Sequence, residues 1–326
     1  MKKLYKKNVK KRKTSFKSSK RKNLKKKNNY KYIYKIVKFV SLFLIMYFHI
    51  FYNNYSKALL DYYYTNRLKD ITRRGKHYDE SNLITFENKL NWLAIHDVKK
   101  LKGKCADKIL LHEYSKRILK KDICNKIIKV YDNPYQININ ELPDQFVLKA
   151  NHGCGFNIIV SDKSKLNVED AKRTLSNWLK IDFSKKSTEF HYSFIKRKVF
   201  AEEYIGSNLN NYKFFCYNGI PRFIYIFKKV EGKGYATYFD IEWNRLDFNC
   251  MEPPNPTEIY PKPQTFGLMK KYASKLSSPF KFVRVDFYEY NNEVRLGEMT
   301  FLPYAGYLNC DKEEHNIELG KYLKLF

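Results

Sequence analysis

The feature that most constrains the fold is a glycine-containing loop, Asn-His-Gly-Cys-Gly-Phe-Asn, at residues 151–157. It follows a short apolar run that ends in Lys149 and precedes the β-branched run 158–160, so we expect it to connect two strands. Gly153 and Gly155 allow the backbone to fold closely over phosphates with its N–H groups pointing inward, while Lys149 supplies a positive charge. Neither a P-loop nor a dinucleotide fingerprint is present. The alternative is an ordinary hairpin with glycines at its turn.

The formal net charge of +30 would suggest a nucleic-acid binder if it covered the folded part of the chain. However, residues 1–38 are rich in lysine and contain no aspartate or glutamate. Such a segment cannot bury enough apolar surface to fold alone. We therefore predict a basic disordered tail at 1–38, and we expect no specific nucleic-acid partner.

Residues 39–52 form an apolar run without a formal charge at neutral pH. It fits a membrane anchor, a cleaved signal peptide or a buried core helix, and it lacks the small-residue cleavage site that a signal peptide needs. We predict a membrane anchor, single-pass or interfacial, whose basic flank lies against anionic lipid on the cytoplasmic side. Residues 53–80 are expected to be a linker or helical stalk. The side on which the following domain lies stays open.

The six cysteines contain no Cys-x-x-Cys pair, which argues against a zinc module and a dense disulfide framework. We expect buried free thiols and a reducing compartment, although an even number of cysteines also permits disulfides. The histidines show no metal-ligand spacing, and no Gly-x-Ser-x-Gly sequence occurs. Metal-hydrolase and serine-hydrolase functions therefore have no support.

Hydrophobic periodicity predicts the main elements of the remaining chain. A helical pattern runs from Ala106 toward Leu119, and a second helix follows Asn167, a suitable N-cap. Asn218-Gly219 predicts a hairpin turn. Strands are expected at 198–205, 211–217, 221–230, 282–290 and 294–301, with a helix at 269–276.

Two of these strands carry acids among apolar neighbours, Asp286 and Glu298. A two-residue turn at 291–292 would place the two acids on opposite faces, whereas a three-residue turn at 291–293 would pair them directly. Directly opposed carboxylates repel each other unless a cation lies between them, and Mg²⁺ prefers such oxygen ligands. The alternative is a solvated strand face with two unrelated acids.

Upstream strands carry further charged residues. Glu202 and Glu203 stand at the end of a strand, where a carboxylate can accept hydrogen bonds from an adenine amino group or ribose hydroxyls. Lys213 can add positive charge against phosphates. Each of these signals is weak by itself.

Taken in order, these motifs resemble the TupA-like ATP-grasp family, which is associated with teichuronopeptide and surface-polysaccharide biosynthesis. The matching segments are Thr85–Leu93, Ala106–Lys108, Leu142–Gly153, Glu202–Tyr204, Tyr212–Phe215, Arg284–Tyr288 and Gly297–Phe301. The resemblance implies an ATP-grasp domain at 81–326, with an α+β fold of two subdomains that hold a nucleotide between antiparallel sheets.

The resemblance also implies roles for individual residues. Lys108 and Lys149 would contact ATP, with Lys149 and Lys213 neutralising charge during catalysis. The loop residues Asn151, His152, Gly153 and Gly155 would cover the phosphates, Glu202 or Glu203 would hold adenine or ribose, and Asp286 with Glu298 would bind Mg²⁺. The sequence departs from the family pattern at Cys154, where serine is common, at Asn211, where an acid is usual, and at Thr300, where other ATP-grasp enzymes use an asparagine ligand.

The expected function is a membrane-anchored, Mg-ATP-dependent ligase that activates a carboxylate as an acyl phosphate. Its acceptor would be a glycan, a sugar acid or an amino acid in a surface polysaccharide or peptide polymer. A glycosyltransferase-like role and a catalytically inactive, membrane-tethered binding domain are the alternatives.

Overall fold

The computed structural model describes residues 33, 35–44, 46–47, 50, 54–206, 209–231, 233–247, 249–250, 252–253, 259–308 and 310–326. Nearly all of the predicted tail at 1–38, and part of the predicted anchor at 39–52, lie outside these residues. Within the described residues, no helix combines the length and the apolar character that crossing a membrane requires.

The chain divides into two compact units, Met1–Tyr62 and Tyr63–Phe326. The second unit therefore begins earlier than the domain boundary predicted at residue 81. Residues 63–73 are helical, and the side chains of Arg67, Ile71 and Tyr78 are buried. The segment predicted as a linker at 53–80 thus contributes its second part to the folded body.

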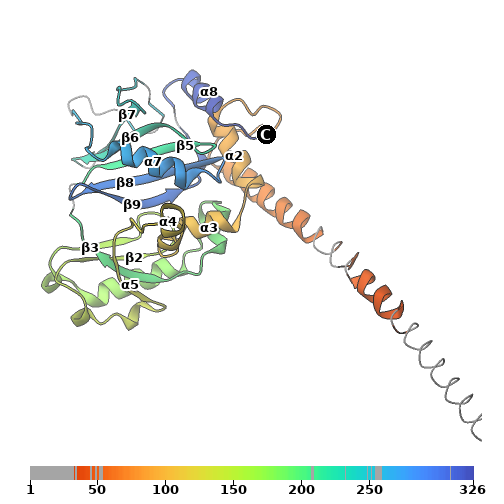
Figure 1. The fold of residues 1–326 in the computed structure, drawn as a ribbon, viewed down its shortest axis with the longest axis horizontal. Coiled ribbons are helices and arrows are strands. Elements are labelled where there is room, and N and C mark those ends of the chain that lie inside the picture. Colours follow the sequence, from red (N-terminus) through yellow and green to blue (C-terminus); the bar gives the residue numbers. More distant parts are fainter. Residues whose placement is uncertain are drawn as a thin grey trace, which may run out of the picture. The chain divides into compact units, whose positions relative to one another are not determined.

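Two antiparallel sheets form the second unit (Figure 1). The smaller sheet has the strand order β1-β4-β2-β3. The larger sheet has the order β7-β6-β5-β8-β9. Their bounds are β1 Ile127–Tyr131, β2 Phe146–Ala150, β3 Asn157–Val160, β4 Val199–Glu203, β5 Asn211–Tyr217, β6 Ile220–Val230, β7 Lys233–Asp240, β8 Phe282–Tyr290 and β9 Glu293–Thr300.

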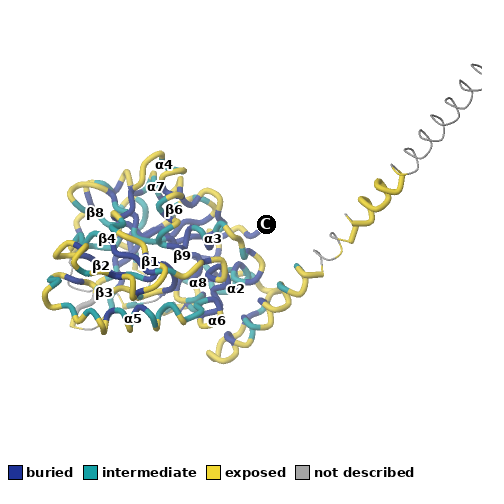
Figure 2. The backbone as a smooth tube through the Cα atoms, turned by 90° about the horizontal axis from the view of Figure 1, so that it is seen from below, coloured by how far each residue is buried: buried dark blue, intermediate teal, exposed yellow. Residues whose placement is uncertain are grey.

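Helices cover the sheets because each sheet has apolar faces to bury. The α-helices are α2 Phe86–His96, α3 Lys100–Ala106, α4 Leu111–Leu119, α5 Val168–Lys180, α6 Phe183–Lys186, α7 Phe266–Ser277 and α8 Glu313–Tyr322. Helix α5 packs on the smaller sheet through Ala171 and Leu175. Most residues of β2 and β4, the two central strands of this sheet, are buried, whereas the helix also carries exposed residues (Figure 2).

Both faces of the larger sheet are covered, which explains why its strands read as nearly continuous apolar runs. Phe214 and Cys216 of β5 point into the core formed with α3, α4 and α7. Phe215 and Tyr217 alternate to the opposite face and pack with residues of α2 and α8. Because successive side chains point to opposite faces of a strand, β5 contributes to two separate hydrophobic cores.

Most of the predicted elements agree with the structure. Asn167 caps α5 by accepting a hydrogen bond from the backbone N–H of Asp170. Asn218 and Gly219 form the predicted hairpin turn, with φ angles of 50° and 80°. Strand β7, at the edge of the larger sheet, was not predicted from the sequence.

The predicted continuous helix from Ala106 toward Leu119 is wrong. Helix α3 ends at Ala106 and α4 begins only at Leu111. The Asp107 carboxylate accepts hydrogen bonds from the backbone N–H groups of Ile109 and Leu110, at 2.8 and 3.3 Å. Such a side chain offers the backbone an alternative to the helical ladder, so the chain turns there and presents Lys108.

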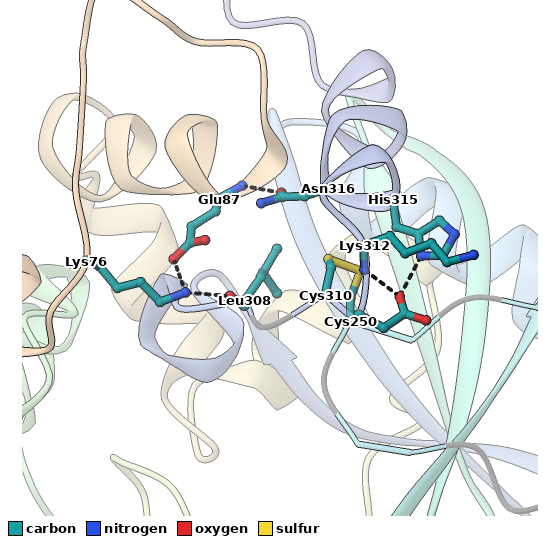
Figure 3. Close-up of a disulfide and its surroundings, with 9 residues drawn as sticks. Lys76, Glu87, Cys250, Leu308, Cys310, Lys312, His315 and Asn316 are labelled. Atoms are coloured by element: carbon teal, nitrogen blue, oxygen red, sulfur yellow. Dashed lines mark hydrogen bonds and ion pairs between the residues drawn. A yellow bond between two sulfur atoms is a disulfide. The ribbon is translucent and has the colours of Figure 1, made fainter.

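The expectation of buried free thiols holds for Cys105, Cys124 and Cys216. Cys154 is free but exposed, and the expectation fails for the remaining two cysteines. Cys250 and Cys310 form a disulfide (Figure 3). The bridge joins the segment after β7 to the segment that leads into α8. The sequence could not indicate this pairing because the two cysteines are 60 residues apart.

Candidate active site

A cavity of about 330 Å³ has walls contributed by both sheets. The predicted site residues that line it are Lys108, Lys149, Gly155, Glu202, Glu203, Asp286 and Glu298. Asn151, His152, Gly153 and Lys213 do not line it. The structure therefore brings seven of the eleven predicted residues to the lining of one cavity and leaves four outside that lining.

Lys108 connects the two sides of the cavity. Its ammonium group donates a hydrogen bond to the carbonyl of Gly153 at 2.8 Å and lies 3.9 Å from the Glu298 carboxylate. Its backbone N–H donates to the Asn151 carbonyl at 3.0 Å. The break between α3 and α4 thus fixes a cation between the glycine loop and β9.

Asn151, for which a phosphate contact was predicted, is buried and does not line the cavity. Its amide nitrogen donates to Asp107 and to the carbonyl of Lys196, at 2.9 and 3.0 Å. Its amide oxygen accepts from the backbone N–H of Lys198 at 2.8 Å. The side chain therefore ties the end of β2 to the turn before α4 and to the start of β4.

His152 is also buried, with its ring edge toward Phe156. Its Nε2 lies 3.1 Å from the carbonyl of Ile181. Burial lowers the pKa of His152 to about 4, so the ring is neutral at pH 7 and Nε2 donates this hydrogen bond. His152 supports the loop and supplies no positive charge to the cavity.

The two glycines of the loop differ in their surroundings. Both have positive φ angles, 72° for Gly153 and 73° for Gly155. A Cβ atom on Gly153 would lie 2.6 Å from the Phe183 ring, whereas a Cβ on Gly155 would meet nothing within 4 Å. Gly153 thus permits close packing of the loop on α6, while Gly155 leaves open space at the cavity.

The smaller sheet, which also holds the glycine loop, carries Lys149 on β2 and the acids of β4. Lys149 forms an ion pair with Glu202, which is buried. The Asn125 amide also donates to Glu202, at 3.4 Å. Glu203 accepts from the backbone N–H of Lys126 at 2.9 Å. These contacts place both acids at the cavity together with residues 204–206, which follow β4.

Asp286 and Glu298 are directly paired across β8 and β9. The turn between these strands has two residues, since Tyr290 pairs with Glu293. A β-bulge compensates for the shorter turn: Asp286 pairs with Glu298 and Phe287 with Leu296, so Gly297 is the extra residue. The predicted pairing of Asp286 with Glu298 is correct, but it results from a two-residue turn combined with a bulge and not from the three-residue turn considered above.

Gly297 is required at this bulge by the close approach of an aromatic ring. A Cβ atom there would lie 2.6 Å from Cε2 of Tyr288. The Tyr288 hydroxyl accepts a hydrogen bond from Asn211 at 3.0 Å, which holds the ring at the cavity. Any side chain at position 297 would therefore displace Tyr288 or the strand.

Asp286 is 1% exposed, and two cations surround its carboxylate. Arg284 donates to both of its oxygens, from Nε at 2.7 Å and from Nη2 at 2.8 Å. Lys213 donates to Oδ2 at 2.5 Å. Burial alone would raise the pKa of Asp286, but Arg284 and Lys213 hold it below its usual value, so the carboxylate is ionised.

Lys213 therefore contacts Asp286 and does not line the cavity. No role was predicted for Arg284, although it stands two residues before Asp286 and so shares its strand face. That spacing was the signal that could have identified it. Arg284 also donates to the hydroxyl of Thr300 at 3.0 Å, which links the carboxylate to the following strand.

The carboxylate pair fits a hard divalent cation. A carboxylate has about four acceptor positions, and the three donors on Asp286 leave about one of them open. The Glu298 carboxylate lies 3.9 Å from the ammonium group of Lys108. Oxygen donors from two neighbouring strands facing one cavity are the ligands that Mg²⁺ prefers.

Glu189 is a buried acid that the sequence analysis missed. It is 7% exposed and lies on the segment between α6 and the 3-10 helix Phe190–Phe194. Burial raises the pKa of Glu189 to about 7, and the nearby charge of Glu298 adds to this shift. No pattern in the sequence marks this residue, because its burial depends on packing between distant segments.

Comparison with known families gives one match. The sequence matches a family model described as TupA-like ATPgrasp over residues 88–324. A comparison with curated proteins gave no significant match.

Several solved structures resemble the chain at low identity. The D-alanine-D-alanine ligase from Helicobacter pylori is 18% identical, with 68% of this chain and 61% of that chain covered and a TM-score of 0.35. The L-amino acid ligase from Bacillus licheniformis is 12% identical, with coverages of 60% and 43% and a TM-score of 0.39. The N5-carboxyaminoimidazole synthetase from Staphylococcus aureus is 11% identical, with coverages of 60% and 44% and a TM-score of 0.35. The chain spans less than two-thirds of the length of each.

Proposed function

Because the chain belongs to the TupA-like ATP-grasp family, we propose that its Tyr63–Phe326 unit is a Mg-ATP-dependent ligase. It would activate a carboxylate as an acyl phosphate, which an amine or another nucleophile then attacks. The observation that carries this proposal is the single cavity that has Lys108 and Lys149 together with the paired Asp286 and Glu298 in its walls.

The chain's own residues suit the charge problem of this reaction, in which a carboxylate must approach a triphosphate. Lys108 and Lys149 offer positive charge on the side of the glycine loop, and Gly155 leaves room for phosphates beside the backbone. Asp286 and Glu298 would hold Mg²⁺, which when bound neutralises charge that develops on the phosphates. Fixed charges in a site that excludes water stabilise the transition state more than they would in bulk solvent.

Within this proposal, Asn151, His152 and Gly153 are positioning residues that shape the loop, and Arg284 and Lys213 keep Asp286 ionised. Glu202 and Glu203 lie at the end of β4 beside 204–206, where they can bind the base or the ribose. The acceptor is proposed to be a glycan, a sugar acid or an amino acid of a surface polysaccharide or peptide polymer. Membrane anchoring through 39–52, with the basic tail on anionic lipid, stays a prediction from the sequence.

The experiment is an ADP-release assay with the full chain in mild detergent, Mg-ATP and a panel of sugar-acid and amino-acid acceptors. We expect ADP release that needs both a carboxylate and a nucleophile. Lys149→Ala should reduce it, whereas the matched surface variant Lys129→Ala should not. Turnover of a sugar nucleotide without ATP would instead indicate a glycosyltransferase, and ATP binding without any turnover would indicate a binding domain.

A further inference from the structure

Three potential metal ligands of different chemistry lie together beside the cavity, and two of them, His112 and Cys124, line it. His112 comes from α4, and Asp122 and Cys124 come from the segment between α4 and β1. One ligand atom from each residue lies within 4.8 Å of the others. The sequence did not reveal this group because the chain separates His112 from the other two residues.

The contacts of this group hold it in place without a ligand. His112 Nδ1 lies 2.8 Å from Asp122 Oδ2, and the other carboxylate oxygen accepts from the backbone N–H of Cys124 at 3.0 Å. The backbone N–H of Leu296 donates to the Ile123 carbonyl at 2.8 Å, which attaches the segment to β9. The donors are therefore arranged between α4 and the strand that carries Glu298.

A second observation also indicates a ligand. Asn125, the residue after Cys124, is 8% exposed and lines the same cavity as His112 and Cys124. Among the residues that the structure describes, its buried amide oxygen finds no hydrogen-bond partner. A buried oxygen acceptor of this kind costs free energy unless something else satisfies it.

We propose that His112, Asp122 and Cys124 bind a thiophilic divalent cation of the Zn²⁺ class in the wall of the cavity, which the Asn125 side chain also lines. Nitrogen, sulfur and carboxylate ligands in one group are typical of Zn²⁺, whereas Mg²⁺ prefers oxygen ligands alone. Binding replaces the proton on the Cys124 sulfur, and that proton is released to solvent. The bound ion would link α4 to the 122–125 segment and stiffen this end of the cavity.

The group also has an explanation without a metal, as a His112–Asp122 ion pair next to a buried thiol. The two explanations differ in what they predict for Co²⁺, which substitutes for Zn²⁺ and absorbs in the near ultraviolet when a thiolate binds it. The test is a titration of the metal-free full chain in mild detergent with Co²⁺, followed by displacement with Zn²⁺. It uses no nucleotide, so its outcome is independent of the proposed ligase activity.

We expect one thiolate-bound Co²⁺ per chain. Cys124→Ser should abolish the near-ultraviolet band, and His112→Ala should weaken binding by at least the roughly 10- to 100-fold that even outer partners of a metal site contribute. Cys154→Ser is the matched control, because Cys154 is a thiol at the same cavity outside the group, and it should leave the band unchanged. Zn²⁺ should also raise the Tm of the wild type and not that of Cys124→Ser.

The proposal is wrong if the folded wild type shows no such band, if the band survives in Cys124→Ser, or if Cys154→Ser removes it. Should Cys124→Ser fail to fold, His112→Ala decides the question, since the His112 side chain is 19% exposed and tolerates truncation better. Binding of Zn²⁺ by His112→Ala with wild-type affinity would then overturn the proposal.

Discussion

At the residue scale, the glycine loop places two glycines of the same backbone conformation in different surroundings. Gly153→Ala would introduce both a positive-φ alanine and a Cβ atom 2.6 Å from the Phe183 ring. We expect it to lower the free energy of unfolding by about 2 to 4 kcal/mol. Gly155→Ala, the control, should lower it by only about 1 to 2 kcal/mol, because its Cβ meets open space. Urea unfolding of both variants measures the difference, and equal losses would contradict the assigned packing.

Glu189 predicts a pH dependence of stability. Its pKa is raised from 4.5 to about 7 in the folded state, so folding favours the protonated carboxyl. The stabilisation is complete below about pH 4.5 and is lost as the pH rises through about 7, by an amount of up to about 3 kcal/mol. Glu189→Gln should therefore gain stability relative to the wild type over this interval in urea unfolding at a series of pH values. A constant difference between the two proteins would show that Glu189 does not titrate there.

The positions of single residues were predicted best for charged side chains within strands. The alternation of apolar neighbours around Asp286 and Glu298 gave their positions, because strand period fixes which face a side chain occupies. Asn151 and His152 were predicted as loop residues facing a ligand, and both instead turn into the protein. The sequence of a loop does not determine where its side chains point, since that depends on segments such as 196–198 and α6 that pack beside it.

At the scale of elements, β8 and β9 show how two local irregularities combine. Asn291 and Asn292 adopt φ angles of 52° and 57°, which suits a two-residue hairpin turn. By itself this turn would place the two acids on opposite faces. The bulge at Gly297 restores the pairing, and the glycine was visible in the sequence. The effect of Gly297 on the register of the two strands could not be seen in the sequence, because glycine is required there by the ring of Tyr288.

The helical segment 63–73 supplies a prediction at the same scale. Arg67 is fully buried and donates to Asn91, to Thr188 at 2.6 Å and to the carbonyl of Ala305 at 2.5 Å. We expect Arg67→Ala to lower the free energy of unfolding by about 3 to 5 kcal/mol, because it leaves buried acceptors and the Asp70 charge without this partner.

The control for Arg67 is Arg73→Ala, which removes an exposed partner of the same Asp70. It should cost less than about 1 kcal/mol. Thermal or urea unfolding distinguishes the two variants. Similar small effects would mean that 63–73 is a detachable linker, and large losses from Arg67→Ala alone would show that it belongs to the folded unit.

At the scale of the whole molecule, the fold class could be predicted because several weak motifs occur in the order that one family requires. The start of the folded unit could not be predicted, because Arg67 is a charged residue in a basic stretch and gives no apolar signal. The Cys250–Cys310 bridge could not be predicted either, because spacing alone does not pair two cysteines 60 residues apart.

The bridge makes the stability of the whole unit sensitive to redox conditions. Closing a loop of this length is worth about 4 kcal/mol in the chain-entropy account, within a usual range of about 2 to 5 kcal/mol. We expect Cys310→Ser, or a reductant, to lower the free energy of unfolding by that amount. Cys154→Ser should not, because Cys154 is free. Mass spectrometry of the unreduced chain, which should show the Cys250–Cys310 peptide pair, provides an independent check.

The measurement that tests the central claim most directly is calorimetric titration of the full chain with ATP, with and without Mg²⁺. We predict binding that requires Mg²⁺ and that weakens by about tenfold or more, or at least about 1.4 kcal/mol, in both Glu298→Gln and Lys149→Ala. Lys129→Ala, an exposed lysine on β1, should bind as the wild type does. A folded wild-type chain that binds no Mg-ATP, or a Lys149→Ala variant with unchanged affinity, would contradict the assignment of this cavity to a nucleotide.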